Sequence, residues 1–254
     1  MSRINSSRNK NKLLITFLST AVILAGCATT DSEKAAKPSE LGDDYGVLLS
    51  FSERERAGTA LFKSQMYVNK NYLYFNDDRV PNDFVLFDRA KRTIYSVTHA
   101  NKTVFVIKPK EVKGEPPIEL DYVAKSQPSS AIPKVSGRVA THYKYTANGK
   151  PCYDAVTLES SFLPDLVGVV KEYRQVLAGE HASTVHSMPK DTHDACDLAL
   201  NVYHATKHLD TGLPMREWDQ KGFLKFMVNY QLKYKMDVAK FEIPKEYNEF
   251  SVGK

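Results

Sequence analysis

Short runs of β-branched and aromatic residues recur at intervals of roughly ten residues through the first half of the chain. The runs are 46–51, 60–68, 72–75, 84–87, 93–98 and 103–107. Turn-forming residues separate them, as at Asp88-Arg89-Ala90-Lys91 and His99-Ala100-Asn101-Lys102. Runs of this kind, punctuated by turns, predict an antiparallel meander. The chain is therefore expected to build its core around one antiparallel sheet.

Two of these runs are apolar on both faces of the predicted strand. They are Phe84-Val85-Leu86-Phe87 and Val104-Phe105-Val106-Ile107. A strand without a polar face needs cover on each side. The inner face of the sheet is therefore expected to be packed, or to line an apolar interior.

The period of the pattern changes in the second half. Further strands are predicted at 118–123, 139–145 and 152–158, with a loop at 126–137. A helix is predicted from Leu163 to Ala178, ended by Gly179, because its apolar residues form one stripe. Asp191 or Thr192 is expected to cap a second helix reaching Lys207, with inward residues Cys196, Ala199, Leu200 and Tyr203.

The C-terminal part predicts a long strand at 224–235. Its even positions are apolar or aromatic and its odd positions mostly polar, which predicts one buried and one wet face. Gly212-Leu213-Pro214-Met215-Arg216 begins the strand before it, with a turn at 219–222. The fold class predicted is α+β, mostly antiparallel β.

The N-terminus has the three parts of an export signal. Basic residues precede an apolar segment, Leu13–Leu24, and small residues follow in Leu24-Ala25-Gly26-Cys27. This ending resembles the lipobox of bacterial lipoproteins. The resemblance implies that 1–26 are removed, that Cys27 is diacylated on sulfur, and that its amine gains a third chain. An ordinary signal with an incidental cysteine is the alternative.

The lipobox resemblance also bears on location. Two or three acyl chains hold a protein stably on a membrane. Because Ala28 follows the cysteine, the resemblance implies the outer membrane, facing the periplasm, in a Gram-negative host. Residues 27–44 are polar and without period, and are expected to form a flexible tether. Residues 45–254 contain no interior linker and are expected to form a single domain.

Charge argues against a nucleic-acid partner. The chain has 35 basic and 30 acidic residues, and four of the basic ones lie in residues 1–26, which leaves 31 against 30. No basic stripe with interleaved aromatic residues follows.

Two cysteines remain if Cys27 carries lipid. In an oxidising compartment they are expected to pair as a Cys152–Cys196 disulfide, joining a helix to a strand. Two buried free thiols are the alternative.

Three pieces of the sequence, in this order, resemble the LolA/LolB fold of envelope lipoprotein carriers and receptors. They are Phe87-Asp88-Arg89 with strands 93–97 and 102–107; Gly212-Leu213-Pro214-Met215-Arg216 with the long strand after it; and Phe241-Glu242-Ile243-Pro244-Lys245-Glu246-Tyr247. The resemblance implies a curved half-barrel of roughly ten or eleven strands, with two or more helices covering the concave face and an apolar cavity between. No position matches that family's functional residues, and the predicted disulfide is not a feature of it.

Catalytic and metal motifs are weak. No G-x-S-x-G elbow occurs. His204 and His208 are four residues apart, but His-Ala-Thr-Lys-His lacks the glutamate of the zinc motif. Acids near His193, namely Asp191 and Asp194, fit helix capping. We expect no enzyme activity, no metal and no cofactor.

One charged loop suggests contact with the membrane. Lys108, Lys110 and Lys113 could meet anionic head groups, or could simply be solvated.

The sequence therefore predicts a non-enzymatic lipoprotein whose half-barrel binds an apolar ligand, such as an acyl chain, with a role in lipid or lipoprotein trafficking. The alternative is a structural or assembly accessory that binds an envelope protein partner through its surface. An envelope hydrolase or metal site ranks last.

Overall fold

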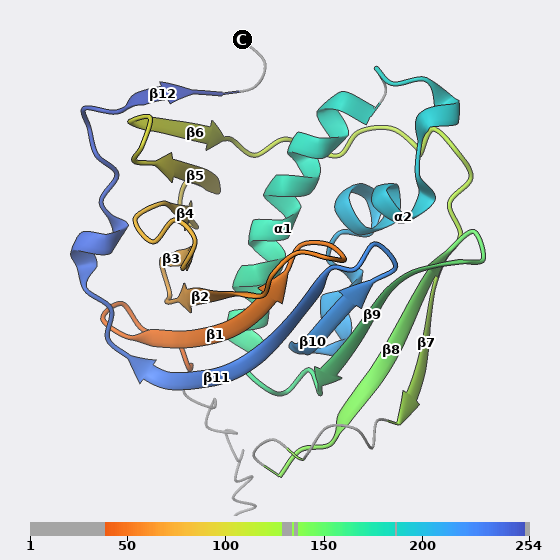
Figure 1. Cartoon of the computed structure of the whole chain (residues 1–254), viewed down its shortest axis with the longest axis horizontal. Coiled ribbons are helices and arrows are strands. Elements are labelled where there is room, and N and C mark those ends of the chain that lie inside the picture. The colour runs from red at the N-terminus through yellow and green to blue at the C-terminus, as the bar shows by residue number, and fades with distance from the viewer. Residues whose placement is uncertain (1–38, 129–133, 135–136, 186, 252–254) are drawn as a thin grey trace, which may run out of the picture. The chain divides into compact units, whose positions relative to one another are not determined.

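The computed structural model describes residues 39–128, 134, 137–185 and 187–251. Within these residues, twelve strands form one sheet that curves around a long helix (Figure 1). The strand order is β12-β6-β5-β4-β3-β2-β1-β11-β10-β9-β8-β7. Neighbouring strands are antiparallel except β12 and β6, which are parallel. The predicted α+β class and curved, mostly antiparallel sheet are confirmed, with slightly more strands than expected.

The strands have the following bounds: β1 Gly46–Arg54, β2 Phe62–Val68, β3 Tyr72–Asp77, β4 Phe84–Asp88, β5 Thr93–Thr98, β6 Thr103–Ile107, β7 Tyr122–Pro128, β8 Ala140–Ala147, β9 Lys150–Leu158, β10 Pro214–Asp219, β11 Leu224–Tyr234 and β12 Asn248–Phe250. The six predicted runs of the first half correspond to β1–β6. The bounds of β5 and β6 match the prediction at both ends.

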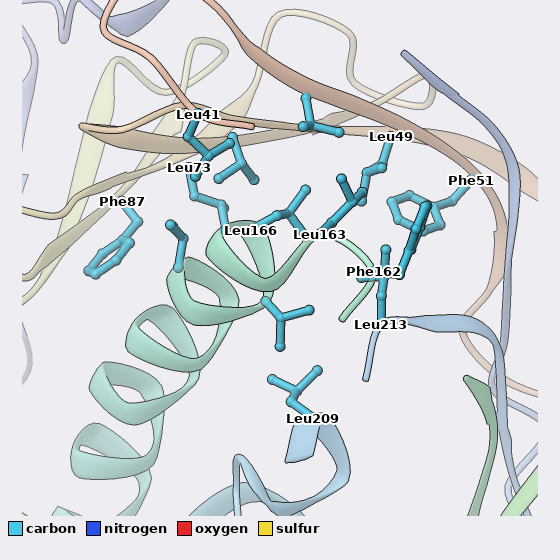
Figure 2. Packing of buried hydrophobic residues seen from close by; sticks show 14 of the residues in the cluster. Leu41, Leu49, Phe51, Leu73, Phe87, Phe162, Leu163, Leu166, Leu209 and Leu213 are labelled. Carbon is cyan, nitrogen blue, oxygen red and sulfur yellow. The ribbon is translucent and has the colours of Figure 1, made fainter. Parts of the chain in front are cut away.

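The concave face of the sheet packs against helix α1 (Pro164–Val185). Figure 2 shows Leu163 and Leu166, at the start of this helix, pointing toward Leu49 and Leu73 of the sheet. Arg89, in the turn after β4, holds the helix from the side: its Nε and Nη2 donate to the Glu172 carboxylate at 2.7 and 2.8 Å. The predicted helix over this segment is confirmed.

Gly179 does not end α1 as predicted, since the helix continues to Val185. A Cβ atom at Gly179 would lie 2.0 Å from the carbonyl oxygen of Lys110. The glycine therefore serves close packing of the segment after β6 against the helix, and not helix termination.

The convex face of β1–β6 is covered by the C-terminal segment. Phe241, at the end of η4 (Val238–Phe241), stacks on Tyr72 with ring centroids 5.0 Å apart. The same segment packs against Tyr74 and Leu86, and β12 then pairs with β6. Strands that are apolar on both faces thus have cover on both sides, as expected.

The prediction that β11 has one buried face and one solvent-exposed face is wrong. Ser50 pairs with Asn229 and Phe51 with Met227, which leaves Val228 as the extra residue of a β-bulge. A bulge exchanges the faces of the residues beyond it. Met227 and Tyr230 therefore both pack on the concave core, while Val228 is 58% exposed.

The strand predicted at 118–123 is wrong in its position along the chain. Strand β7 begins at Tyr122 and continues to Pro128, into the predicted loop. The apolar residues Ile118 and Leu120 instead pack beside Leu198 and Val202, in the segment after α1.

The predicted second helix is broken into short pieces. They are η1 Lys190–Thr192, α2 Ala195–Leu198, η2 Ala199–Tyr203 (a π-helical turn) and η3 Lys207–Thr211. Asp194, and not Asp191 or Thr192, caps α2 by accepting the N–H of Asp197. Arg174 of α1 donates to the carbonyl oxygens of Leu200 (2.8 Å) and Ala205 (3.4 Å), so these groups face α1 instead of continuing a regular helix.

The predicted boundary between tether and domain at residue 44/45 is also corrected. Leu41 is buried in the core. The Glu40 carboxylate accepts the N–H groups of Asp165 (2.8 Å) and Leu166 (3.1 Å) at the start of α1. Residues 39–44 therefore belong to the folded part. Cys27, the predicted signal at 1–26 and the rest of the predicted tether lie outside the described residues.

No helix within the described ranges combines the length and the apolar character needed to cross a membrane.

Candidate functional site

A cavity of about 380 Å³ lies on the concave side, between the sheet and the helices. Strands β1, β2, β9, β10 and β11 supply one wall, and α1, η2 and η3 supply the other. Much of the lining is apolar and includes Leu49, Phe51, Met66, Val170, Leu200 and Leu213. The strands that are apolar on both faces, β4 and β6, supply no residue to this lining.

A row of polar side chains crosses the sheet at one side of this cavity. Glu53, Lys225 and Glu217 are direct cross-strand neighbours on β1, β11 and β10. Ser64 of β2 and Tyr153 of β9 stand at the two ends of the row. We call these five residues the polar row.

One half of the polar row is a satisfied ion pair. The Lys225 Nζ lies 3.2 Å from a Glu53 carboxylate oxygen, which also accepts a hydrogen bond from the Ser64 hydroxyl. The same ammonium lies over the ring of Phe51, 4.1 Å from its centroid. Lys225 therefore has an anionic partner and an aromatic contact within the protein.

The other half of the polar row is less well compensated. The Tyr153 hydroxyl donates to the Glu217 carboxylate. Among the described residues, no basic side chain forms an ion pair with Glu217. Burial raises the pKa of the Glu217 carboxyl above its ordinary value of 4.5, although the charge of Lys225, the hydrogen bond from Tyr153 and the charge of Arg174 oppose this. Burial also raises the pKa of Tyr153, so its hydroxyl remains a donor.

His208, which also lines the cavity, has a buried ring nitrogen without a hydrogen-bond partner among the described residues. This nitrogen is Nδ1, and the side chain as a whole is buried. Burial, and then the charges of Arg174 and Lys171, lower the pKa of His208 to about 3. The imidazole is therefore neutral at physiological pH, and it can donate or accept a hydrogen bond but cannot supply positive charge.

A disulfide fixes the segment that carries Leu200 and Asn201 into the cavity wall. Cys152 and Cys196 are bonded, with their Cα atoms 5.3 Å apart. Cys152 lies at a bulge of β9, between Tyr153, which pairs with Tyr145, and Pro151, which pairs with Thr146. The predicted disulfide, and its role in joining a helix to the sheet, are confirmed.

The structure does not bring together His204 and His208, the two histidines that lie four residues apart in the sequence. His204 stacks on Tyr122, with ring centroids 5.2 Å apart, whereas His208 lies against Tyr153. Asp194 is used as the cap of α2. No three potential metal ligands converge in the part of the chain that the structure describes.

Two of the three lysines in the loop after β6 form ion pairs. Lys110 lies 2.8 Å from Glu180 on α1, and Lys113 lies 3.9 Å from Glu111. Lys108 is exposed.

Sequence reasoning misses the polar row. The alternation in 224–235 places Lys225 on a wet face, and Glu53 lies just outside the run predicted at 46–51. A signal is nevertheless present: Phe51 and Glu53 share one face of β1, so an acid follows the core residues inward. What the sequence cannot supply is the order that places β1, β11 and β10 side by side.

Comparison with known proteins leaves the chain without an assigned family. No family model and no curated protein matches it. Among solved structures, it is similar to an uncharacterized conserved protein from Thermus thermophilus, at 8% identity and a TM-score of 0.41, covering 81% of this chain and 89% of that one. It is also similar to PNGF-II, at 8% identity and a TM-score of 0.38; the match covers 81% of this chain but only 30% of that protein.

Proposed function

We propose that this protein is a non-enzymatic lipoprotein, anchored to the outer membrane through Cys27, that binds one apolar ligand in the concave cavity. The observation that carries the proposal is the 380 Å³ cavity with largely apolar walls inside the curve of the sheet. Binding sites for small ligands are concave, mostly apolar and about 300–1,000 Å³ in volume. The cavity falls at the lower end of that range, which suits a single acyl chain.

The physical advantage lies in combining a shelter with an anchor. An acyl chain gains about 0.8 kcal/mol for each CH₂ group removed from water. A cavity tethered near a membrane meets such chains at high local concentration. A LolA/LolB-like half-barrel with a role in lipid or lipoprotein trafficking is consistent with this arrangement.

A fluorescent, uncharged dodecyl probe tests the proposal. Leu200→Trp places a large side chain at a half-buried position in the cavity wall. Val228→Trp makes the same change at an exposed position of β11. We expect the wild type and Val228→Trp to bind one probe with equal affinity, and Leu200→Trp to bind at least about tenfold more weakly, because overfilling costs about 1–3 kcal/mol.

Absence of probe binding to the wild type would refute the proposal. So would equal binding by Leu200→Trp, provided that circular dichroism shows that variant to be folded.

A second candidate function is an assembly accessory that acts through its surface. Val228 and Leu232 of β11 are 58% and 52% exposed, which is unusual for large apolar side chains in a strand. If a partner binds this surface, Val228→Asp will lose a stoichiometric envelope protein in co-purification, and Leu200→Trp will keep it.

A further inference from the structure

We propose that the ligand of the cavity carries a cationic amine beside its apolar body, and that Glu217 is the residue that binds this amine. The inference rests on the proposed function, because it requires that the cavity hold an apolar ligand. It adds the chemical class of the ligand and a residue that determines specificity.

The first argument is the count of charges along the polar row. Two carboxylates, Glu53 and Glu217, flank one ammonium, Lys225, on three adjacent strands. Lys225 is within 3.2 Å of Glu53, and no ion pair joins it to Glu217 in the described structure. The row therefore presents to the cavity one acid that has no ion-pair partner among the described residues.

The second argument is that Arg174, the other cation whose charge acts on Glu217, forms no ion pair with it in the described structure. Arg174 donates to two main-chain oxygens, those of Leu200 and Ala205, and forms no ion pair within the described residues. His208 is neutral. A carboxylate partly removed from water without a counter-charge is unfavourable. A ligand amine would supply that charge.

The third argument concerns hydrogen bonds. Tyr153 donates one bond to Glu217, which leaves the carboxylate with free acceptor sites. An ammonium has three donors and can therefore use these free acceptor sites. An anionic head group would instead meet the negative charges of Glu53 and Glu217.

The test uses three competitors of equal chain length against the uncharged dodecyl probe: dodecylamine, dodecanol and dodecanoate. At neutral pH we expect dodecylamine to displace the probe about tenfold more effectively than dodecanol, as a charge-assisted hydrogen bond predicts. Glu217→Gln should remove this preference and leave dodecanol unchanged. Glu249→Gln, an exposed acid on β12, is the matched control and should behave as the wild type.

A pH series on the wild-type protein tests the same inference without any variant, so it stays informative if Glu217→Gln fails to fold. Displacement by dodecylamine should weaken as the pH falls through the raised pKa of Glu217, while displacement by dodecanol stays constant. The charged and titratable groups of the cavity around Glu217 are Glu53, Asp219, Lys225, Tyr153, Tyr173, Arg174 and His208. The other acids are Glu53, which is paired with Lys225, and Asp219, which accepts two main-chain N–H groups, and both are common to the two competitors.

Three results would overturn the inference. If dodecanoate is the best competitor, the ligand has an anionic head group, which Arg174 would bind. The three chains could compete equally, which would refute the amine but keep the proposed function. If the probe binds nowhere in the wild type, both fail.

Discussion

Glu217 lies directly opposite Lys225 across the β10–β11 pair, yet the ammonium of Lys225 forms its ion pair with Glu53, on the strand at its other side. The carboxylate of Glu217 is left with the Tyr153 hydroxyl as its hydrogen-bond donor. A polar group of this kind inside an apolar cavity carries a cost in stability that a purely structural core would not need.

This cost predicts a pH dependence. Burial raises the pKa of Glu217 in the folded protein above its ordinary value of 4.5. Between the ordinary and the raised pKa, the folded state binds more protons than the unfolded state, so stability falls as the pH rises through that window. Glu217→Gln should lack this fall and should be at least as stable as the wild type at pH 7. Urea unfolding at a series of pH values measures it. A wild-type curve that rises through the window along with that of the variant would contradict the prediction.

The disulfide should contribute strongly to stability. It closes a loop between residues 44 apart in sequence, which in the chain-entropy model corresponds to about 3 to 4 kcal/mol. The double variant Cys152→Ala/Cys196→Ala should lose free energy of unfolding on that scale and should bind the dodecyl probe more weakly, since the segment bearing Leu200 loses its attachment. Denaturant unfolding and probe titration test both effects. A loss of less than about 1 kcal/mol would contradict the account.

Two glycines on α1 should respond oppositely to alanine. Alanine favours a helix interior over glycine by about 1 kcal/mol. At Gly168 no atom lies within 4 Å of an added Cβ, so Gly168→Ala should stabilise the protein. At Gly179 the Cβ would lie 2.0 Å from the Lys110 carbonyl oxygen, so Gly179→Ala should destabilise it despite the better helix propensity. Thermal unfolding of the two variants provides the comparison. A higher melting temperature for Gly179→Ala would show that this packing is not tight.

Lipidation of Cys27 is the prediction on which the anchor depends. Labelled palmitate should enter the wild-type protein and not Cys27→Ser, and the variant should leave the membrane fraction, because one cleavable signal without acyl chains cannot hold it there. Cys152→Ala/Cys196→Ala, with Cys27 intact, is the control and should remain labelled. Equal labelling of Cys27→Ser would refute the lipobox interpretation.

Local pattern predicts the meander well, because β5 and β6 are rich in β-branched and aromatic residues and each is bounded by turn residues. It fails where distant parts of the chain decide. The bulge at Val228 is imposed by pairing with β1 and has no signature in the sequence of β11. The second helix is interrupted where Arg174, about 30 residues away, takes its carbonyl groups. The apolar residues Ile118 and Leu120 favour a strand when only the local sequence is considered. In the structure they pack against a short helical segment from a distant part of the chain.

The candidate site divides in the same way. The disulfide follows from the cysteine count, whereas the sheet side of the cavity wall comes from β1, β2, β9, β10 and β11 and not from the strands that are apolar on both faces. The polar row depends on β1 meeting β11, whose sequences lie at opposite ends of the folded part. Only that pairing makes Glu53, Lys225 and Glu217 neighbours.

Native mass spectrometry of the full-length protein, extracted gently from its own membrane, tests the central claim most directly. The account predicts one additional apolar molecule per wild-type protein, released on gentle activation and absent from Leu200→Trp but present in Val228→Trp. A wild-type mass explained by the lipidated chain alone, or the same added mass in both variants, would contradict it.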